Sequence, residues 1–123
     1  MSLDCATRLV IGDIMIDQVT YSKLLAETWE TITELGNKKG GEYAADNDRL
    51  ANFRRNAERL GMKMETIWAI YAAKHWDAIM QYCSDFNVGI DRPRMEPIAG
   101  RADDLIVYLI LFKAMLLERE REQ

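Results

Sequence analysis

The sequence has little proline and glycine, only two cysteines and no strongly basic stretch. Two Pro and seven Gly stand against 49% hydrophobic residues, a composition that excludes a collagen-like or disordered chain. Cys5 and Cys83 have neither metal-ligand spacing nor a disulfide framework, and no secretory signal opens the chain, which favours a reducing cytoplasm. The 16 Lys+Arg and 20 Asp+Glu are interspersed and give a net charge of −4, so we expect no nucleic-acid duplex as partner.

Long hydrophobic runs are also absent. The longest nearly continuous apolar stretch, residues 105–117, contains Lys113 and is shorter than the roughly 20 residues that span a bilayer. We therefore expect no membrane partner. A chain of 123 residues is long enough for one buried core, which predicts a single domain over residues 1–123.

Apolar residues recur at helical spacing in four segments that follow an N-terminal arm, residues 1–17. The first helix is predicted over 20–35, where Gly36 and Asn37 indicate a stop. Asp48 is expected to cap a second helix that Gly61 ends, and Pro97 to open the fourth. The third is predicted over 64–86, and loops over 38–48 and 87–95. These segments predict an all-α fold, a compact bundle of about four helices over 18–123.

Each helix has an expected core stripe. The four stripes are Tyr21, Leu24, Leu25, Thr28, Ile32 and Leu35; Leu50, Phe53, Ala57 and Leu60; Met64, Ile67, Trp68, Tyr71, His75, Ala78, Ile79, Tyr82 and Phe86; and nearly every residue from Leu105 to Leu117.

Several polar residues have spacings that suit a site. Glu27, Glu30 and Glu34 share one helix face, which fits either a divalent cation or a solvated flank. Arg101 and Asp104 head the apolar line that continues through Tyr108, so they either pair with each other or face a polar ligand.

His75, the only histidine, lies on an apolar stripe. That position suits a core residue as well as a ligand or a general base. A zinc site is disfavoured, because one His and two distant Cys do not make a ligand set.

The segment 38–48 combines two glycines with Lys39, Glu42, Tyr43 and other ligand-type groups. It is not a phosphate-binding P-loop, since the spacing and a preceding strand are both missing. It is not a calcium loop either, because Ala57 occupies the position of the bidentate Glu. We expect a mobile, polar loop here.

Three strings, KKGGEYAADNDRLANFRRNAERLG, YAAKHWDAI and EPIAGRADDLIVYLILFKAML, resemble a group of small phage and prophage proteins over residues 38–117. The positions that match the pattern of this group are Lys39, Glu42, Tyr43, Asn52, Phe53, Lys74, His75, Glu96, Arg101, Asp104 and Tyr108.

The stretch ADDLIVYLILFKAML is also similar to the last core helix of MazG-like nucleoside triphosphate pyrophosphohydrolases, and Glu27-Thr28-Trp29-Glu30 fits their E-x-x-E motif. This resemblance implies that Glu27, Glu30 and Asp104 hold a catalytic Mg²⁺, which orients water on the α-phosphorus. One position departs from the pattern. Arg101 stands where the second Glu of the last helix is expected, so Glu96, Glu42 or Asp103 would have to supply that ligand.

Two functions follow as hypotheses. In the first, the protein is a Mg²⁺-dependent (d)NTP pyrophosphohydrolase with catalytic Glu27, Glu30 and Asp104. Its substrate is bound by Lys39, Glu42, Tyr43, Asn52, Lys74, His75, Arg101 and Tyr108. In the second, it is a non-catalytic phage accessory protein that binds a nucleotide or a host protein through the same residues, and Mg²⁺ is not required.

We predict that the chain forms a homodimer or a higher assembly. Three short amphipathic helices can hardly cover a fourth that is apolar on nearly every face, so a second chain is the expected cover. Size-exclusion chromatography with light scattering tests this, and a species of one chain mass, 14.2 kDa, at every concentration would contradict it.

Overall fold

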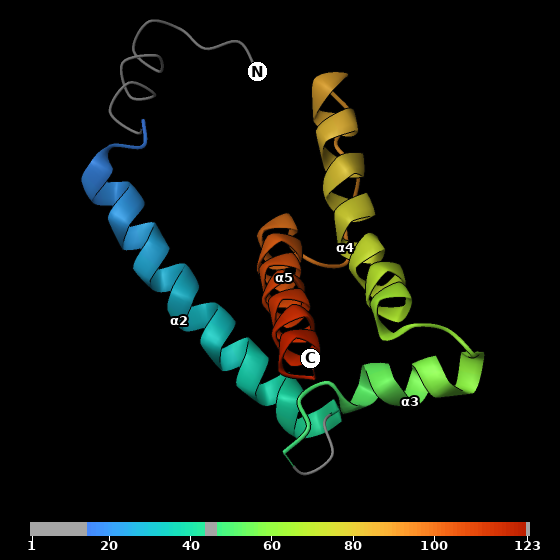
Figure 1. The fold of residues 1–123 in the computed structure, drawn as a ribbon. Helices are drawn as coiled ribbons and strands as arrows, with labels where there is room; N and C mark the ends of the chain where they lie inside the picture. The colour runs from blue at the N-terminus through green and yellow to red at the C-terminus, as the bar shows by residue number, and fades with distance from the viewer. Residues whose placement is uncertain (1–14, 44–46, 123) are drawn as a thin grey trace, which may run out of the picture. The chain divides into compact units, whose positions relative to one another are not determined.

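Four α-helices make up the described part of the chain (Figure 1). The computed structural model describes residues 15–43 and 47–122, and for residues 39–43 the backbone alone. The helices are α2 (Gln18–Tyr43), α3 (Ala51–Leu60), α4 (Met64–Asn87) and α5 (Ile98–Arg121), and these residues form no strand. The predicted all-α class is thus confirmed, whereas most of the predicted N-terminal arm lies outside the described residues. None of the described helices is long and apolar enough to cross a membrane.

The chain divides into two units, Met1–Glu30 and Thr31–Gln123, of which each is described by itself. In the first, α2 starts two residues earlier than its apolar spacing indicated, because Asp17 caps it. The Asp17 carboxylate accepts a 2.7 Å hydrogen bond from the Thr20 amide, which lowers the pKa of Asp17. Tyr21, Leu24 and Leu25 of the expected stripe are 50–53% exposed here.

The hydrophobic core lies in the second unit, and all four helices contribute to it. Its buried members are Ile32, Leu50, Phe53, Ala57, Ile67, Val107, Leu111 and Met115. Within this unit α4 packs along α5, and α3 packs against α4 (Figure 1). Ile67 and Met115 are each only 2% exposed, and truncating such a side chain to Ala typically costs about 2–5 kcal/mol.

The predicted end of the first helix at Gly36 and Asn37 is wrong. The helix continues through three glycines to Tyr43, so the expected loop 38–48 is helical over its first half. Arg49 donates a 3.3 Å hydrogen bond from Nη2 to the Gly36 carbonyl, which holds this part of the helix by a contact distant in sequence. A mid-helix Gly costs only about 1 kcal/mol, and tertiary contacts can outweigh that penalty.

The prediction that Asp48 caps α3 is wrong, because Asp48 instead forms a turn before the helix. Its carboxylate accepts a 3.0 Å hydrogen bond from the Leu50 amide, and Leu50 is the capping position. Gly61 ends α3 as expected, with φ +63° and its N–H directed to the Glu58 carbonyl, while the next amide, that of Met62, bonds to the Ala57 carbonyl. This pair of hydrogen bonds is a Schellman motif, which favours glycine at the left-handed position.

The prediction that Leu60 and Phe86 belong to the core is wrong, since their exposed fractions are 61% and 74%. Each lies in the last turn of its helix.

Asp85, the neighbour of Phe86 in sequence, is buried, which the sequence pattern did not predict. It is 2% exposed. It accepts hydrogen bonds from Gln81, Arg92 and Arg94, and the bond from Arg92 contributes most to lowering the pKa of Asp85 to about 2. The loop 88–95 is thereby tied to the end of α4.

The N-terminus of α5 differs from the prediction by one residue. Pro97 is its capping position and Ile98 its first helical residue, with no side-chain cap from Glu96. Such a difference is within the normal variation of helix boundaries.

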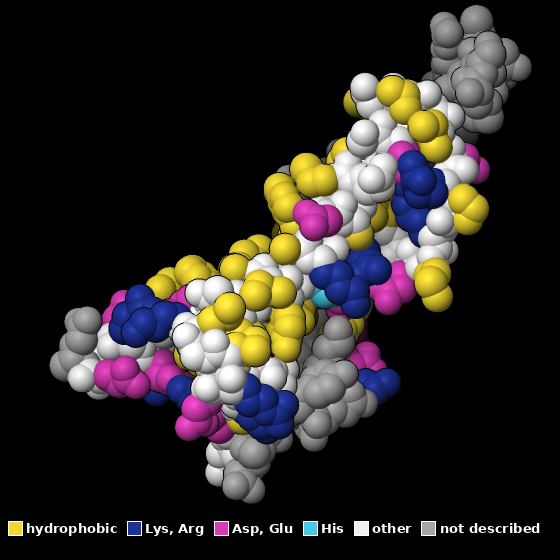
Figure 2. Space-filling model, turned by 90° about the vertical axis from the view of Figure 1, so that its right-hand side faces the viewer, with side chains coloured by type: hydrophobic (Ala, Val, Ile, Leu, Met, Phe, Trp, Pro, Cys, Tyr) yellow, Lys and Arg dark blue, Asp and Glu magenta, His cyan; other side chains and the backbone are white. Residues whose placement is uncertain are grey.

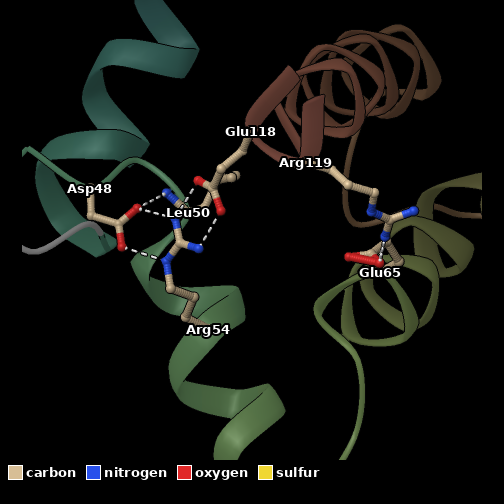
Figure 3. A network of polar contacts seen from close by, with 6 residues as sticks. All are labelled: Asp48, Leu50, Arg54, Glu65, Glu118 and Arg119. Carbon is tan, nitrogen blue, oxygen red and sulfur yellow. Dashed lines mark hydrogen bonds and ion pairs between the residues drawn. The ribbon is translucent and has the colours of Figure 1, made fainter. Parts of the chain in front are cut away.

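Arg54 connects the turn before α3 to the end of α5 (Figure 3). It donates to Asp48 at 2.7 and 2.9 Å and to both oxygens of Glu118 at 2.5 Å. These bonds lower the pKa of Asp48 and of Glu118 and raise the pKa of Arg54. Arg119 of α5 pairs with Glu65 of α4, so α5 is bound at its C-terminal end to both neighbours.

We predict opposite effects for two Gly→Ala substitutions. Gly36 is helical with open space around its Cα, so Gly36→Ala should stabilise the protein by about 0.5–1 kcal/mol. Gly61 has φ +63°, so Gly61→Ala should destabilise it by about 1 kcal/mol. Urea denaturation of both variants measures the two changes. The same sign for both would contradict the helical path through Gly36.

Arg54→Met should lower the free energy of unfolding at pH 7 by about 1 kcal/mol. The pKa values of Asp48 and Glu118 are lowered in the folded state, so their stabilisation is present above the unfolded carboxyl pKa of about 4 and is lost as pH falls through the folded values. The difference in stability between the wild type and the variant should therefore shrink as the pH falls below about 4. The matched control is Arg55→Met, because among the described residues the exposed Arg55 bonds to Asn52 alone. An equal loss in both variants would contradict the role of Arg54.

Candidate functional site

A cavity of about 280 Å³ lies in the second unit, between α3, α4 and α5. Its polar lining consists of Arg49, Asn52, Lys74, His75, Glu96, Asp104 and Tyr108, and its apolar lining of Phe53, Val107 and Leu111. Both charge signs meet here, beside the side of α5 that faces the core.

Helical spacing explains why α5 supplies so much of this cavity. Val107, Tyr108 and Leu111 lie three, four and seven positions after Asp104, so the four residues share one helix face. Trp68 of α4 donates a 2.6 Å hydrogen bond from Nε1 to the Tyr108 carbonyl, which fixes α4 against α5 at this level.

His75 is the most central polar residue. It is 7% exposed, and its Nδ1 lies 3.3 Å from Nη1 of Arg101 and 3.6 Å from Oδ2 of Asp104. Its ring packs on Tyr108 at 5.3 Å between centroids. A neutral imidazole can accept a hydrogen bond at Nδ1, whereas a protonated one donates there. The histidine therefore faces a cation and an anion at one nitrogen.

Arg101 stands between this histidine and the segment before α5. Its Nε lies 3.3 Å from Oε2 of Glu96, and its side chain is 19% exposed. The expected alternatives for Arg101 were a pair with Asp104 or a polar ligand. The contacts with Glu96 and His75 hold the guanidinium at the edge of the cavity.

Two further cations line the cavity. Burial lowers the pKa of Arg49, which still stays charged at neutral pH. Lys74 is exposed, and it has no ion-pair partner within residues 15–38 and 47–122. Figure 2 shows the single histidine (cyan) at the border of a group of basic side chains (dark blue).

The structure thus brings together many of the residues that the sequence singled out. Asn52, Lys74, His75, Asp104 and Tyr108 line one cavity, with Arg101 at its edge. The side chains of Lys39, Glu42 and Tyr43 lie outside the described residues.

The predicted metal ligands come from different parts of the chain. Glu27 and Glu30 are exposed on the part of α2 that belongs to the first unit, and Asp104 belongs to the second. Among the described side chains, no three His, Cys, Asp or Glu residues gather as a metal site. The Mg²⁺ site with these three carboxylates stays a prediction.

Arg49 is the cavity residue that sequence reasoning missed. It sits in the turn before α3, where periodicity carries no signal. Its place depends on the C-terminal half of α2, to which it is hydrogen-bonded at Gly36. The only available signal was its position beside the matched residues Asn52 and Phe53.

No protein family, no curated protein and no solved structure matches the chain. The chemistry of the cavity is therefore the basis on which a function can be proposed.

Proposed function

We propose that the protein binds a phosphorylated nucleotide in this cavity. The observation that carries the proposal is the convergence of Asn52, Lys74, His75, Asp104 and Tyr108 on one cavity, with Arg49 and Arg101 beside them.

The charge distribution suits such a ligand. Arg49 and Lys74 offer charged donors to phosphate oxygens, and charge-assisted bonds of this kind are among the stronger ones in proteins. The carboxylates of Glu96 and Asp104 can accept hydrogen bonds from sugar hydroxyl or base amino groups, which a simple inorganic anion lacks.

Size and remaining contacts agree with a small nucleotide. A volume of about 280 Å³ lies near the lower end of the range of about 300–1,000 Å³ for small-molecule pockets. The amide nitrogen of Asn52 donates to none of the described residues, since only its oxygen is engaged, by Arg55 and Asn56. Asn52 is thus suited to position a base or a sugar.

A second candidate is the Mg²⁺-dependent (d)NTP pyrophosphohydrolase. It is favoured by two carboxylates, Asp104 and Glu96, in the same cavity as the basic groups. In this mechanism Glu27 and Glu30 would complete the oxygen ligand set, and Lys39 and Lys74 would hold phosphates. The bound metal would orient the attacking water and neutralise the pyrophosphate leaving group.

The setting of this function is proposed as follows. The protein would act in the cytoplasm, of the host cell if it is encoded by a phage, where nucleotides are abundant. It would associate with itself, since Leu109 and Leu117 of α5 stay about half exposed in the single chain. If the cavity holds no nucleotide, the remaining proposal is an accessory protein that binds a host protein.

Calorimetric titration of the protein with (d)NTPs, each with and without Mg²⁺, tests the proposal. We expect the protein to bind at least one nucleotide. Lys74→Gln should lower the affinity for that nucleotide at least about tenfold, or about 1.4 kcal/mol. The control is Lys63→Gln. This substitution removes the same charge at the start of α4, and Lys63 does not line the cavity. Equal affinity in both variants, or no binding of any nucleotide, would contradict the proposal.

Release of pyrophosphate in the same mixtures separates the two candidates. If the protein is a hydrolase, pyrophosphate should appear only with Mg²⁺, and Asp104→Asn should abolish it. Binding without turnover for every nucleotide would leave the non-catalytic nucleotide-binding function.

A further inference from the structure

Helix α5 has two apolar faces, and within the described part of the second unit only one of them is buried. Val107, Leu111 and Met115 are buried in the core. On the other side of the helix, the large apolar residues are 41–50% exposed, and they are Leu109, Ile110, Leu116 and Leu117. Apolar side chains that gather on one exposed face mark an interaction surface more often than single ones do.

The exposed face has the spacing of a coiled-coil seam. Residues recur at steps of four and three along it, and they are Ala102, Ile106, Leu109, Lys113, Leu116 and Glu120. Ile106 is half-buried and also packs against the edge of the core, and the others are exposed. We call this set the α5 seam. Such a seam packs against another helix of the same kind, with its residues seated between those of the partner.

Two opposite charges at the seam have no ion-pair partner among the residues that the structure describes. Lys113 lies within the seam and Asp103 borders it, and neither makes an ion pair with any residue in the described ranges. They are ten positions apart on one helix, about 15 Å along its axis, so they cannot reach each other. On a second copy of the helix, each of these charges would find the opposite one.

We infer that the α5 seam binds the α5 seam of a second copy, antiparallel and around a two-fold axis. In a parallel pair, Lys113 would face its own counterpart, and like charges repel. In the antiparallel register that places Ile106 against Leu109 of the second copy, Lys113 lies opposite Ala102 of the second copy, next to its Asp103. By symmetry the pair forms twice, and both unpartnered charges are satisfied.

The interface is expected to be modest and separate from the cavity. A standard interface buries about 800 Å² on each partner, and one pair of 24-residue helices reaches the lower end of that range. Asp104, Tyr108 and Leu111 line the cavity from other positions of the helix, so the pairing leaves it open. The inference rests on the self-association proposed above and is independent of nucleotide binding.

Charge exchange tests both the surface and the register. Lys113→Glu and Asp103→Lys should each weaken the dimer at least about tenfold, because each brings like charges together in both copies. The double variant should return to within about threefold of the wild-type dissociation constant, since the pair is restored with its signs exchanged. Sedimentation equilibrium from micromolar to submillimolar concentration measures all four proteins.

Two further variants keep the test decisive. Leu109→Glu should abolish the dimer, whereas Leu60→Glu should not, because Leu60 is an exposed leucine on α3 and not part of the α5 seam. Circular dichroism verifies that each variant is folded. A wild type that is monomeric throughout would overturn self-association and this inference together. A dimer that survives Leu109→Glu, or that the double variant does not restore, would overturn the α5 seam or its register alone.

Discussion

The packing of α4 along α5 is the contact on which the second unit depends. One face of α5 supplies Val107, Leu111 and Met115 to the core, and α4 supplies Ile67. The hydrogen bond from Trp68 to the Tyr108 carbonyl fixes the two helices at one level, and the pair of Arg119 with Glu65 joins them farther along. Because interiors are closely packed, these contacts leave little freedom for one helix to slide along the other.

The cavity is a consequence of that fixed register. With α4 and α5 held at Trp68 and Tyr108, His75 is placed beside Arg101 and Asp104, although the two segments are far apart in sequence. α3 closes the same space from its side with Asn52 and Phe53. A buried imidazole would be costly here without partners, and the groups of α5 supply them.

Charge is distributed so that the cavity favours a ligand with both acceptor and donor groups. Arg49 and Lys74 attract anions, while Glu96 and Asp104 repel a bare anion unless a cation or a hydroxyl donor lies between. Under the proposed function, this balance would let an acidic protein with a net charge of −4 bind a phosphate group. It also explains why the cavity is less suited to an extended nucleic acid, which needs a continuous basic surface.

Helix positions and much of the candidate site were predictable from local sequence. Apolar spacing gave α3, α4 and α5 nearly to their ends, because burial of one face imposes a period of about 3.6 residues. The same helical period predicted that His75 lies on a buried stripe and that Asp104 shares a helix face with Tyr108. Gly61 was readable as a helix end because a left-handed residue there favours glycine.

Contacts between distant segments decided the rest. The continuation of α2 past Gly36, the place of Arg49 and the burial of Asp85 each depend on a partner that local spacing does not reveal. Leu60 and Phe86 fit their stripes, yet they lie in the last turns of their helices, where the described residues leave them largely exposed. The sequence by itself determined which residues share a helix face. Only the tertiary structure decided which faces meet, because the register between helices is set by side chains packing from several segments at once.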